Sequence, residues 1–301
     1  MPELPDILLY LRALEPRTVG YRVTGVRLAN PFLLRSIEPP LSAVNGRAIV
    51  GLERLGKRIV MAAEGDLFLV FHLMIAGRFR WKPVGTKISG KVGLFALDFA
   101  HGTLMLTEAG TRRQASLYVV EGRAALMPHN PGGLEIAEAS LIDFQAALQR
   151  DNHTLKRALT DPHLFSGIGN AYSDEILHAA RLSPFKQTAS LTADEVRRLY
   201  DATRLTLDQW TSRLQQEAGG DFPDKVTAFR EGMAVHGRYG KPCPECGSPV
   251  QRVVYAAHEA NYCATCQTGG RLLADRSLSR LLREDWPRTL EELERRRRGP
   301  T

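Results

Sequence analysis

Residues 243–266, CPECGSPVQRVVYAAHEANYCATC, say more about the fold than any other stretch, because they hold all four cysteines of the chain. The cysteines form two Cys-x2-Cys pairs separated by sixteen residues. Four thiolates at this spacing can surround one tetrahedral zinc ion; a redox pair or a chance cluster is the alternative. A four-cysteine site has no open coordination position. The sequence therefore predicts one structural zinc per chain, held by Cys243, Cys246, Cys263 and Cys266.

A hairpin and a group of helices are predicted next to the cysteines. Residues 250–256 have the composition of one strand of the hairpin. Upstream of it, Thr192 and Glu195 form a capping-box pattern at the start of the longest predicted helix. Helical spacing of apolar residues predicts helices over residues 154–160, 169–181 and 192–216.

The N-terminal part of the chain is predicted to be one helix followed by strands. Residues 5–15 have helical spacing, and Pro16 is expected to end that helix. Residues 22–120 contain short apolar runs broken by turn signals, the strongest being residues 68–81 and 94–106. Because no long helical pattern interrupts these runs, they favour an antiparallel sandwich or barrel.

Composition and charge exclude several classes of protein. The chain has 301 residues, of which 44% are apolar and 24% charged, which argues against disorder or a coiled coil. No uncharged apolar run reaches the roughly 18 residues of a membrane helix, and no basic leader opens the chain, so we expect a cytoplasmic protein with no membrane partner. The net charge of +7 suits a polyanionic partner. The basic run at residues 295–298 is expected to be solvated and mobile.

The first three residues, Met1, Pro2 and Glu3, are a candidate for covalent chemistry. A small second residue normally permits removal of the initiator methionine, which leaves Pro2 as a free secondary amine. An α-amino group has a pKa near 8, so a sizeable neutral fraction exists at pH 7 and can attack an aldehyde carbon. Glu3 is placed to shuttle protons. The alternative is an ordinary Met-Pro start without a catalytic role.

Several other residues are candidates for phosphate binding. Gly167-Ile168-Gly169-Asn170 precedes a predicted helix, where backbone N–H groups can bind a phosphate; a tight turn with Asn170 as the helix cap is the alternative. Lys57 stands where a hairpin turns, and Arg112 lies in a loop after a strand. Such residues clamp a nucleic-acid backbone or are simply solvated. His72 lies on a predicted apolar strand, so the preferred interpretation is a buried histidine whose hydrogen bonds are satisfied.

These motifs together resemble the formamidopyrimidine-DNA glycosylase and endonuclease VIII family. The first six residues, MPELPD, are similar to the start of that family, and residues 167–175 resemble its helix-two-turn-helix. Gly56-Lys57 is similar to the family's hairpin lysine, and His72-Leu73 to its His-Leu motif. The finger ends in Cys-x2-Cys-Gln, as the family's does. The resemblance covers residues 1 to about 267 in the correct order.

The resemblance implies an α+β multidomain fold. An N-terminal helix and an antiparallel β-sandwich are expected to form a catalytic domain, and helices a helix-two-turn-helix DNA-binding domain. A zinc-finger β-hairpin and a basic tail are expected to follow. The corresponding ranges are residues 1–131, 132–231, 232–270 and 271–301.

The resemblance also implies base excision from double-stranded damaged DNA by a monomeric enzyme of the bacterial type, associated with the nucleoid. The damaged nucleotide would be flipped out of the duplex. Pro2 would attack C1′ of its sugar, and β- and δ-elimination would follow, while Glu3 protonates the sugar oxygen. Lys57 and Asn170 would hold the flanking phosphates, and Arg112 would fill the space left by the base. His72 is expected among the DNA-binding residues.

Three departures from the family pattern bear on specificity. His258 stands where the family has a finger arginine, which would grip a phosphate through two parallel bonds. Gln114 and Ala115 replace an aromatic wedge and its neighbour, and Ile75 replaces a methionine. The segment 219–229 is short for a loop that caps 8-oxoguanine. The chain is therefore expected to differ in lesion choice from ordinary 8-oxoguanine enzymes.

Two other functions compete with excision. The weakened finger and the missing wedge suit a non-catalytic binder of damaged or distorted DNA, and replacing Pro2 would distinguish it from an enzyme. A zinc-ribbon transcription or RNA-binding factor explains the cysteines and the basic charge. It leaves the Pro2-Glu3 start and the Gly167–Asn170 motif unexplained, so it ranks last.

Overall fold

The computed structural model describes residues 1–88, 90–110, 112–223, 226–255, 258–274 and 287–298. The chain divides into two compact units, which are described separately: unit 1 is residues 1–132 with 209–228, and unit 2 is residues 133–208 with 229–301. The first boundary between them falls after residue 132. The expected division into four domains stays a prediction.

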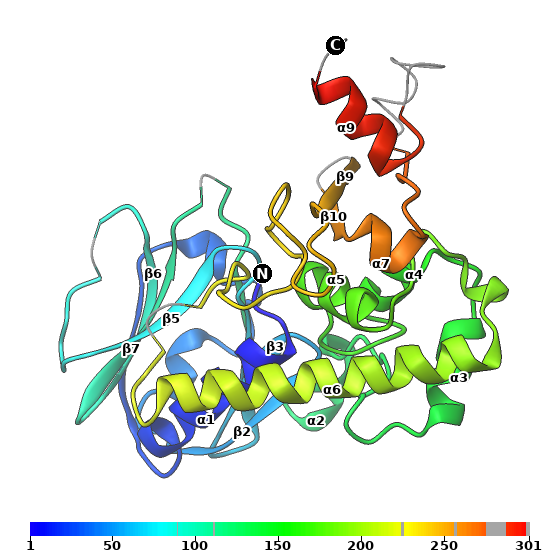
Figure 1. Ribbon diagram of the computed structural model, residues 1–301. Helices are drawn as coiled ribbons and strands as arrows, with labels where there is room; N and C mark the ends of the chain where they lie inside the picture. The colour runs from blue at the N-terminus through cyan, green and yellow to red at the C-terminus, as the bar shows by residue number, and fades with distance from the viewer. Residues whose placement is uncertain (89, 111, 224–225, 256–257, 275–286, 299–301) are drawn as a thin grey trace. The chain divides into compact units, whose positions relative to one another are not determined.

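Unit 1 is a helix followed by an antiparallel sandwich (Figure 1). The strands form two four-stranded sheets, ordered β1-β6-β7-β5 and β2-β3-β4-β8, which confirms the expected architecture. Each of the two strongest predicted runs contains two strands. Those in residues 68–81 belong to different sheets, whereas those in residues 94–106 pair with each other. The elements are α1 (Leu4–Thr18), β1 (Val23–Leu28), β2 (Ile49–Leu55), β3 (Arg58–Ala63), β4 (Leu67–His72), β5 (Gly77–Lys82), β6 (Gly93–Phe99), β7 (Gly102–Glu108), β8 (Ser116–Glu121) and α2 (Arg123–Leu126), with 3-10 turns at Pro31–Leu33, Leu41–Val44 and Met127–His129.

Strands β3 and β4 are buried on both faces, which explains their nearly continuous apolar sequences. Successive side chains of a strand point to opposite faces. Ile59 and Phe71 therefore enter the main core between the sheets, where they meet apolar residues of β5, β6 and β7. Val60 and Val70 point the other way and pack under Leu126 of α2. This double burial makes the β3–β4 pair a rigid base for the residues at its ends.

The expectation that Pro16 ends the first helix is wrong. Helix α1 continues through Pro16 to Thr18. Proline removes the hydrogen bond that its own nitrogen would donate, and its ring crowds the carbonyl four residues earlier. The following turn still closes, since Thr18 Oγ1 donates to the carbonyl of Leu14 at 2.9 Å and Val19 N donates to that of Glu15 at 3.0 Å.

Unit 2 contains the predicted helices and the finger hairpin (Figure 1). The capping box at the start of α6 is confirmed, because Thr192 N donates to Glu195 Oε2 at 2.9 Å and Glu195 N to Thr192 Oγ1 at 3.3 Å. Helix α6 continues past the boundary into unit 1. The elements are α3 (Leu141–Gln149), α4 (Leu155–Thr160), α5 (Asn170–Ala179), a 3-10 turn at Thr188–Ser190, α6 (Ala193–Ala218), β9 (Gln251–Tyr255), β10 (His258–Tyr262), α7 (Ala264–Thr268) and α9 (Leu290–Arg298).

The basic run near the C-terminus lies in a helix, and its expected mobility stays a prediction. Residues 290–298 form helix α9, in which Glu291 and Glu292 occupy the first turn. Acidic residues at that end complement the helix dipole. Arg295 and Arg296 are exposed, in line with the expected solvation.

Candidate functional site

The first residues of the chain are buried at the start of α1. Pro2 is buried, and only 2% of Glu3 is exposed. Glu3 immediately precedes the helix, and its backbone N–H donates to Asp6 Oδ2 at 2.9 Å. Sequence reasoning did not assign a role to Asp6, although its spacing of three from Glu3 is the capping-box pattern. Asp6 therefore fixes the backbone on which Pro2 and Glu3 sit.

Charged residues surround the N-terminal amine. Burial lowers the pKa of the Met1 ammonium, and the nearby Glu3 carboxylate acts in the opposite direction. Arg78 and Lys57 lower that pKa further, while Asp6 raises it. An amine with a lowered pKa is neutral, and hence nucleophilic, in a larger fraction of molecules at pH 7.

Lys57 lies in the turn between β2 and β3, as expected. The strands pair from Leu55 with Arg58, which leaves Gly56 and Lys57 as the two turn residues. Burial lowers the pKa of Lys57, and the Glu3 carboxylate raises it. The structure therefore brings Lys57 within electrostatic reach of Glu3, residues that are far apart in sequence.

His72 ends β4 and lies opposite Arg58 of β3. Burial, together with the positive charges of Arg58 and Lys57, lowers the pKa of His72 to about 4. His72 is therefore neutral near pH 7 and can offer a hydrogen-bond donor and an acceptor but no charge. Sequence reasoning did not assign a role to Arg58, because its position opposite His72 follows from strand register.

His72 should make the protein less stable in acid. An unfolded histidine titrates near 6.5, whereas the folded side chain stays neutral down to about 4. Between these values the unfolded chain binds the extra proton, so the contribution of His72 is full above pH 6.5 and is lost as the pH falls toward 4. We expect His72→Gln to reduce the fall in Tm between about pH 7.5 and about pH 5. A fall as large as in the wild type would contradict this assignment.

The loop after β4 is tight and presents an apolar side chain. Gly77 N donates to the Leu73 carbonyl at 2.9 Å, and a Cβ on Gly77 would lie 2.2 Å from that oxygen, so only glycine fits. Ile75 at the tip is 64% exposed. The residue that stands in for the family's methionine therefore faces solvent within unit 1.

Arg112 is exposed in the loop between β7 and β8. The buried carboxylate of Glu108 closes the base of this loop, because it accepts hydrogen bonds from the backbone N–H groups of Gln114 and Ala115 at 3.0–3.4 Å. Among the residues with described positions, none of Pro2, Glu3, Lys57 and His72 forms a hydrogen bond or ion pair with Arg112.

Asn170 is the first residue of α5, so the alternative in which it caps the helix is wrong by one position. Gly169 is the N-cap. Gly167, with φ of 80°, allows the chain to turn into the helix. Among the residues that the structure describes, none forms a hydrogen bond with the Asn170 side chain. That amide is therefore available to a ligand in unit 2.

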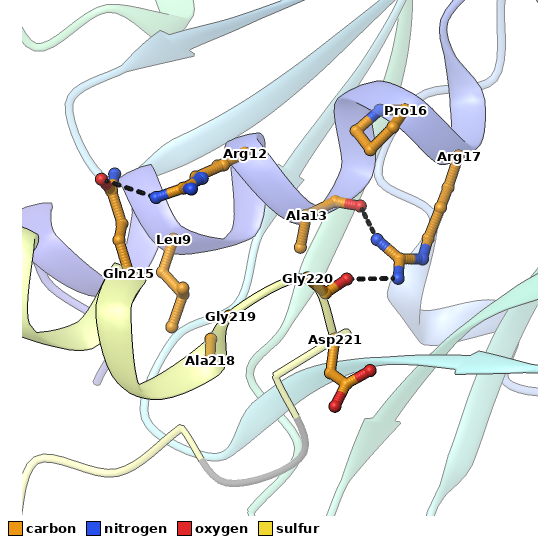
Figure 2. Close-up of a pocket in the computed structure, with 10 residues that line it drawn as sticks. All are labelled: Leu9, Arg12, Ala13, Pro16, Arg17, Gln215, Ala218, Gly219, Gly220 and Asp221. Carbon is orange, nitrogen blue, oxygen red and sulfur yellow. Dashed lines mark hydrogen bonds between the residues drawn. The ribbon is translucent and has the colours of Figure 1, made fainter.

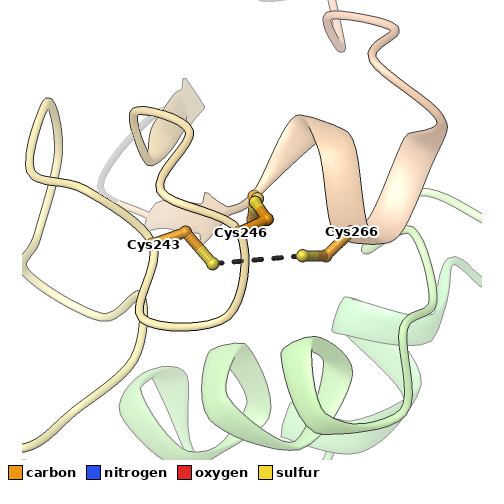
Figure 3. A group of neighbouring side chains, drawn as sticks. Cys243, Cys246 and Cys266 are labelled. Atoms are coloured by element: carbon orange, nitrogen blue, oxygen red, sulfur yellow. Dashed lines mark hydrogen bonds between the residues drawn. The ribbon is translucent and has the colours of Figure 1, made fainter.

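The four cysteines lie together at the finger (Figure 3 labels three of them). Their sulfur atoms are all within 4.8 Å of one another, with Cys243 and Cys266 separated by 4.0 Å and Cys246 and Cys263 by 3.4 Å. Four sulfurs bonded to zinc at about 2.3 Å in a tetrahedron are about 3.8 Å apart. The donor set and its spacing therefore fit one zinc ion.

Buried polar groups of α5 hold the finger in place within unit 2. The Glu175 carboxylate accepts the backbone N–H groups of Ala234, Val235 and His236 at 2.7–2.9 Å. His178 Nε2 lies 3.2 Å from the sulfur of Cys243. The segment before the first cysteine pair, and one zinc ligand, are thus bonded directly to α5.

His258 is the first residue of β10 and pairs with Tyr255 across the hairpin. It therefore borders the hairpin tip, as expected for the residue that replaces the family's arginine. Residues 256–257, between the two strands, lie outside the described residues.

A cavity of about 160 Å³ in unit 1 lies away from these residues (Figure 2). Arg17 lines the cavity and donates hydrogen bonds to the carbonyls of Ala13 and Gly220, and Arg12 donates one to Gln215. None of the candidate site residues lines it. The lining residues are Leu9, Arg12, Ala13, Pro16, Arg17, Gln215, Ala218, Gly219, Gly220 and Asp221.

Comparison with known proteins places this chain in a family. Models of the formamidopyrimidine-DNA glycosylase N-terminal domain, of its H2TH domain and of the zinc finger found in FPG and IleRS match residues 1–117, 135–215 and 240–269. The chain is 34% identical over 279 residues to the formamidopyrimidine-DNA glycosylase of Thermus thermophilus, covering 90% of this chain and 100% of that protein. The chain belongs to the formamidopyrimidine-DNA glycosylase family. It is thus a DNA glycosylase and abasic-site lyase, and its four cysteines form a structural zinc site.

Solved structures of this glycosylase family share the fold. Fpg from Lactococcus lactis, in complex with DNA containing an abasic site, aligns with a TM-score of 0.77 at 23% identity over 88% of this chain and 99% of that one. The same protein with DNA containing N7-benzyl-Fapy-dG aligns with a TM-score of 0.78 at 24% identity, over 89% and 100%. Among the described residues of our glycosylase, no helix is long and apolar enough to cross a membrane.

Proposed function

We propose that this glycosylase removes a damaged base from double-stranded DNA and cleaves the resulting abasic site, with the amine of Pro2 as the nucleophile. The observation that carries the proposal is that Pro2 and Glu3 are buried at the start of α1, with Lys57 within electrostatic reach of Glu3. After removal of Met1, the secondary amine of Pro2 would occupy the start of this buried segment. The protein would act as a monomer in the bacterial cytoplasm, at the nucleoid.

The proposed chemistry uses groups that this chain supplies. The Pro2 nitrogen attacks C1′ as the bond from C1′ to the base breaks, and Glu3 gives a proton to the ring oxygen, which opens the sugar. The resulting iminium makes the C2′ proton acidic, so its transfer to the carboxylate that ring opening leaves on Glu3 expels the 3′ phosphate. A second elimination expels the 5′ phosphate, and water then hydrolyses the iminium and frees Pro2. Lys57 would neutralise a flanking phosphate as this charge develops.

The proposed lesion specificity differs from that of ordinary 8-oxoguanine enzymes. Ile75 faces solvent where the family pattern has a methionine, and Gln114 and Ala115 stand at the aromatic wedge, with their N–H groups held by Glu108. A loop without an aromatic ring has less stacking surface for the bases next to the lesion. Cleavage of a panel of duplexes, each with one oxidised purine or pyrimidine, tests this point. Preference for 8-oxoguanine would refute it.

Borohydride trapping on a duplex with one abasic site tests the function itself. The enzyme should give a covalent adduct between its N-terminus and the sugar, located by mass spectrometry of the N-terminal peptide. The second candidate, a non-catalytic binder of damaged or distorted DNA, is favoured by His258 in place of the finger arginine. Binding without an adduct, from protein with Met1 removed, would favour that candidate.

Lys57→Ala and Asn170→Ala should each weaken binding to a duplex that contains an abasic-site analogue. Each substitution removes one proposed phosphate contact, and a charge-assisted contact corresponds to about tenfold or more in Kd. Fluorescence anisotropy across a salt series measures this, and Lys57→Ala should also flatten the salt dependence. Arg295→Ala, in the exposed tail helix, is a control that removes an equal charge. Unchanged affinity for both variants would refute the phosphate contacts.

A further inference from the structure

One buried carboxylate of unit 2, Asp174 in α5, has no part in the proposed chemistry. It is fully buried, and three donors converge on its two oxygens. Lys156 Nζ lies 2.5 Å from Oδ1, while His236 Nδ1 and Asn261 Nδ2 lie 2.8 Å and 3.1 Å from Oδ2. These donors compensate the loss of water around the charge, which would otherwise be costly.

The partners of Asp174 come from three separate parts of unit 2. Lys156 belongs to α4, Asn261 to β10 of the finger hairpin, and His236 to the segment before the first cysteine pair. Helix α5 packs against both α4 and β10 (Figure 1). A single side chain of α5 therefore bonds to both α4 and the finger hairpin.

Lys156 extends this network to the candidate phosphate contact. Its Nζ also donates to the backbone carbonyl of Asn170 at 2.7 Å, and its side chain is only 12% exposed. An ammonium so enclosed is placed to hold the backbone of Asn170 rather than to meet DNA itself. The bonded path thus runs from the finger, through Asp174 and Lys156, to the first residue of α5.

The amide of Asn261 supports the same interpretation. Only 1% of Asn261 is exposed, and its Oδ1 has no hydrogen-bond partner among the described residues. A buried amide with an unsatisfied oxygen is unfavourable compared with an apolar side chain of the same size. The bond from Nδ2 to Asp174 is the interaction that offsets this cost.

We propose that Asp174 is a positioning residue for DNA binding. Through Lys156 and Asn261 it holds Asn170 and the finger hairpin in one fixed arrangement, so that both are already ordered when the phosphate backbone arrives. Binding then costs less conformational entropy. This inference rests on the proposed function, because the contact between Asn170 and DNA belongs to it.

The test compares Lys156→Met with Lys186→Met. Lys186 is a matched control, since it pairs with Glu195 at 2.6 Å in the same unit and, within the described part of the chain, forms no hydrogen bond with Asn170 or the finger. We expect Lys156→Met to weaken binding to a tetrahydrofuran-containing duplex about tenfold, the effect of one charge-assisted bond, and Lys186→Met to change it less than about twofold. Zinc content and the single-turnover rate of trapping at saturating abasic DNA should stay at wild-type values. Equal affinities for the two variants would overturn the proposal.

A double variant distinguishes positioning from general destabilisation. If Lys156 acts through Asn170, Lys156→Met combined with Asn170→Ala should bind no more than about twofold more weakly than Asn170→Ala alone. Full additivity of the two losses would overturn the proposal. Asp174→Asn keeps the size of the side chain but removes its charge, and it should weaken DNA binding as much as is expected of Lys156→Met. It takes the place of Lys156→Met in the test if that variant folds poorly. A wild type that gives no trapped adduct would instead refute the proposed function, whereas these binding comparisons would still decide the role of Asp174.

Discussion

Pro2→Gln should abolish the adduct that borohydride traps on abasic DNA. A large second residue keeps the initiator methionine, so the secondary amine is never released, and the remaining amine of Met1 is displaced by one residue from the proposed attacking position. Because a nucleophile must approach within about 3–3.5 Å of the carbon it attacks, we expect trapping to fall by about a thousandfold or more. Gel analysis of the trapped duplex, with mass spectrometry of the N-terminus, measures both quantities.

Two variants control for damage to the fold. Pro2→Gly should be processed normally and keeps an N-terminal amine, so it should retain part of the adduct. Glu3→Gln keeps Pro2 and should slow ring opening without affecting the removal of Met1. If the Pro2→Gln protein with Met1 retained formed the adduct at the wild-type rate, another residue would be the nucleophile.

Removal of zinc should unfold the finger while leaving unit 1 folded. The apolar cluster around the metal ligands is small, since it consists of Val235 and Val250 beside two of the cysteines. A structural zinc contributes about 10 kcal/mol or more, which this small cluster cannot replace. After chelation we expect amides of residues 234–267 to lose hydrogen-exchange protection and DNA affinity to fall more than a hundredfold. Strands β3 and β4 should keep their protection, since their core contains no metal ligand.

Cys243→Ser combined with Cys263→Ser should reproduce the effect of the chelator. Thr265→Ala is a suitable control, because its side chain is exposed and its hydroxyl contacts that of Ser248. Loss of protection throughout β3 and β4 on chelation would contradict the independence of the sandwich from the metal.

Local patterns predicted much of the fold. The spacing of the cysteines, the capping box at Thr192 and the apolar runs of the sandwich each depend on residues that are close in sequence. One local expectation failed, since α1 continues through Pro16 because the turn after it still closes.

The sequence by itself determined which residues could do chemistry: an amine at Pro2, an acid at Glu3 and a set of zinc ligands. Only the tertiary structure decided which of them act together. Strand register places Arg58 beside His72, turn geometry brings Lys57 within reach of Glu3, and helix packing joins Lys156 and Asn261 at Asp174. The two members of each pair are 14 to 87 residues apart in sequence, and Lys57 and Glu3 are 54 residues apart. Periodicity describes one element at a time, whereas burial and charge at a site depend on what several elements bring to it.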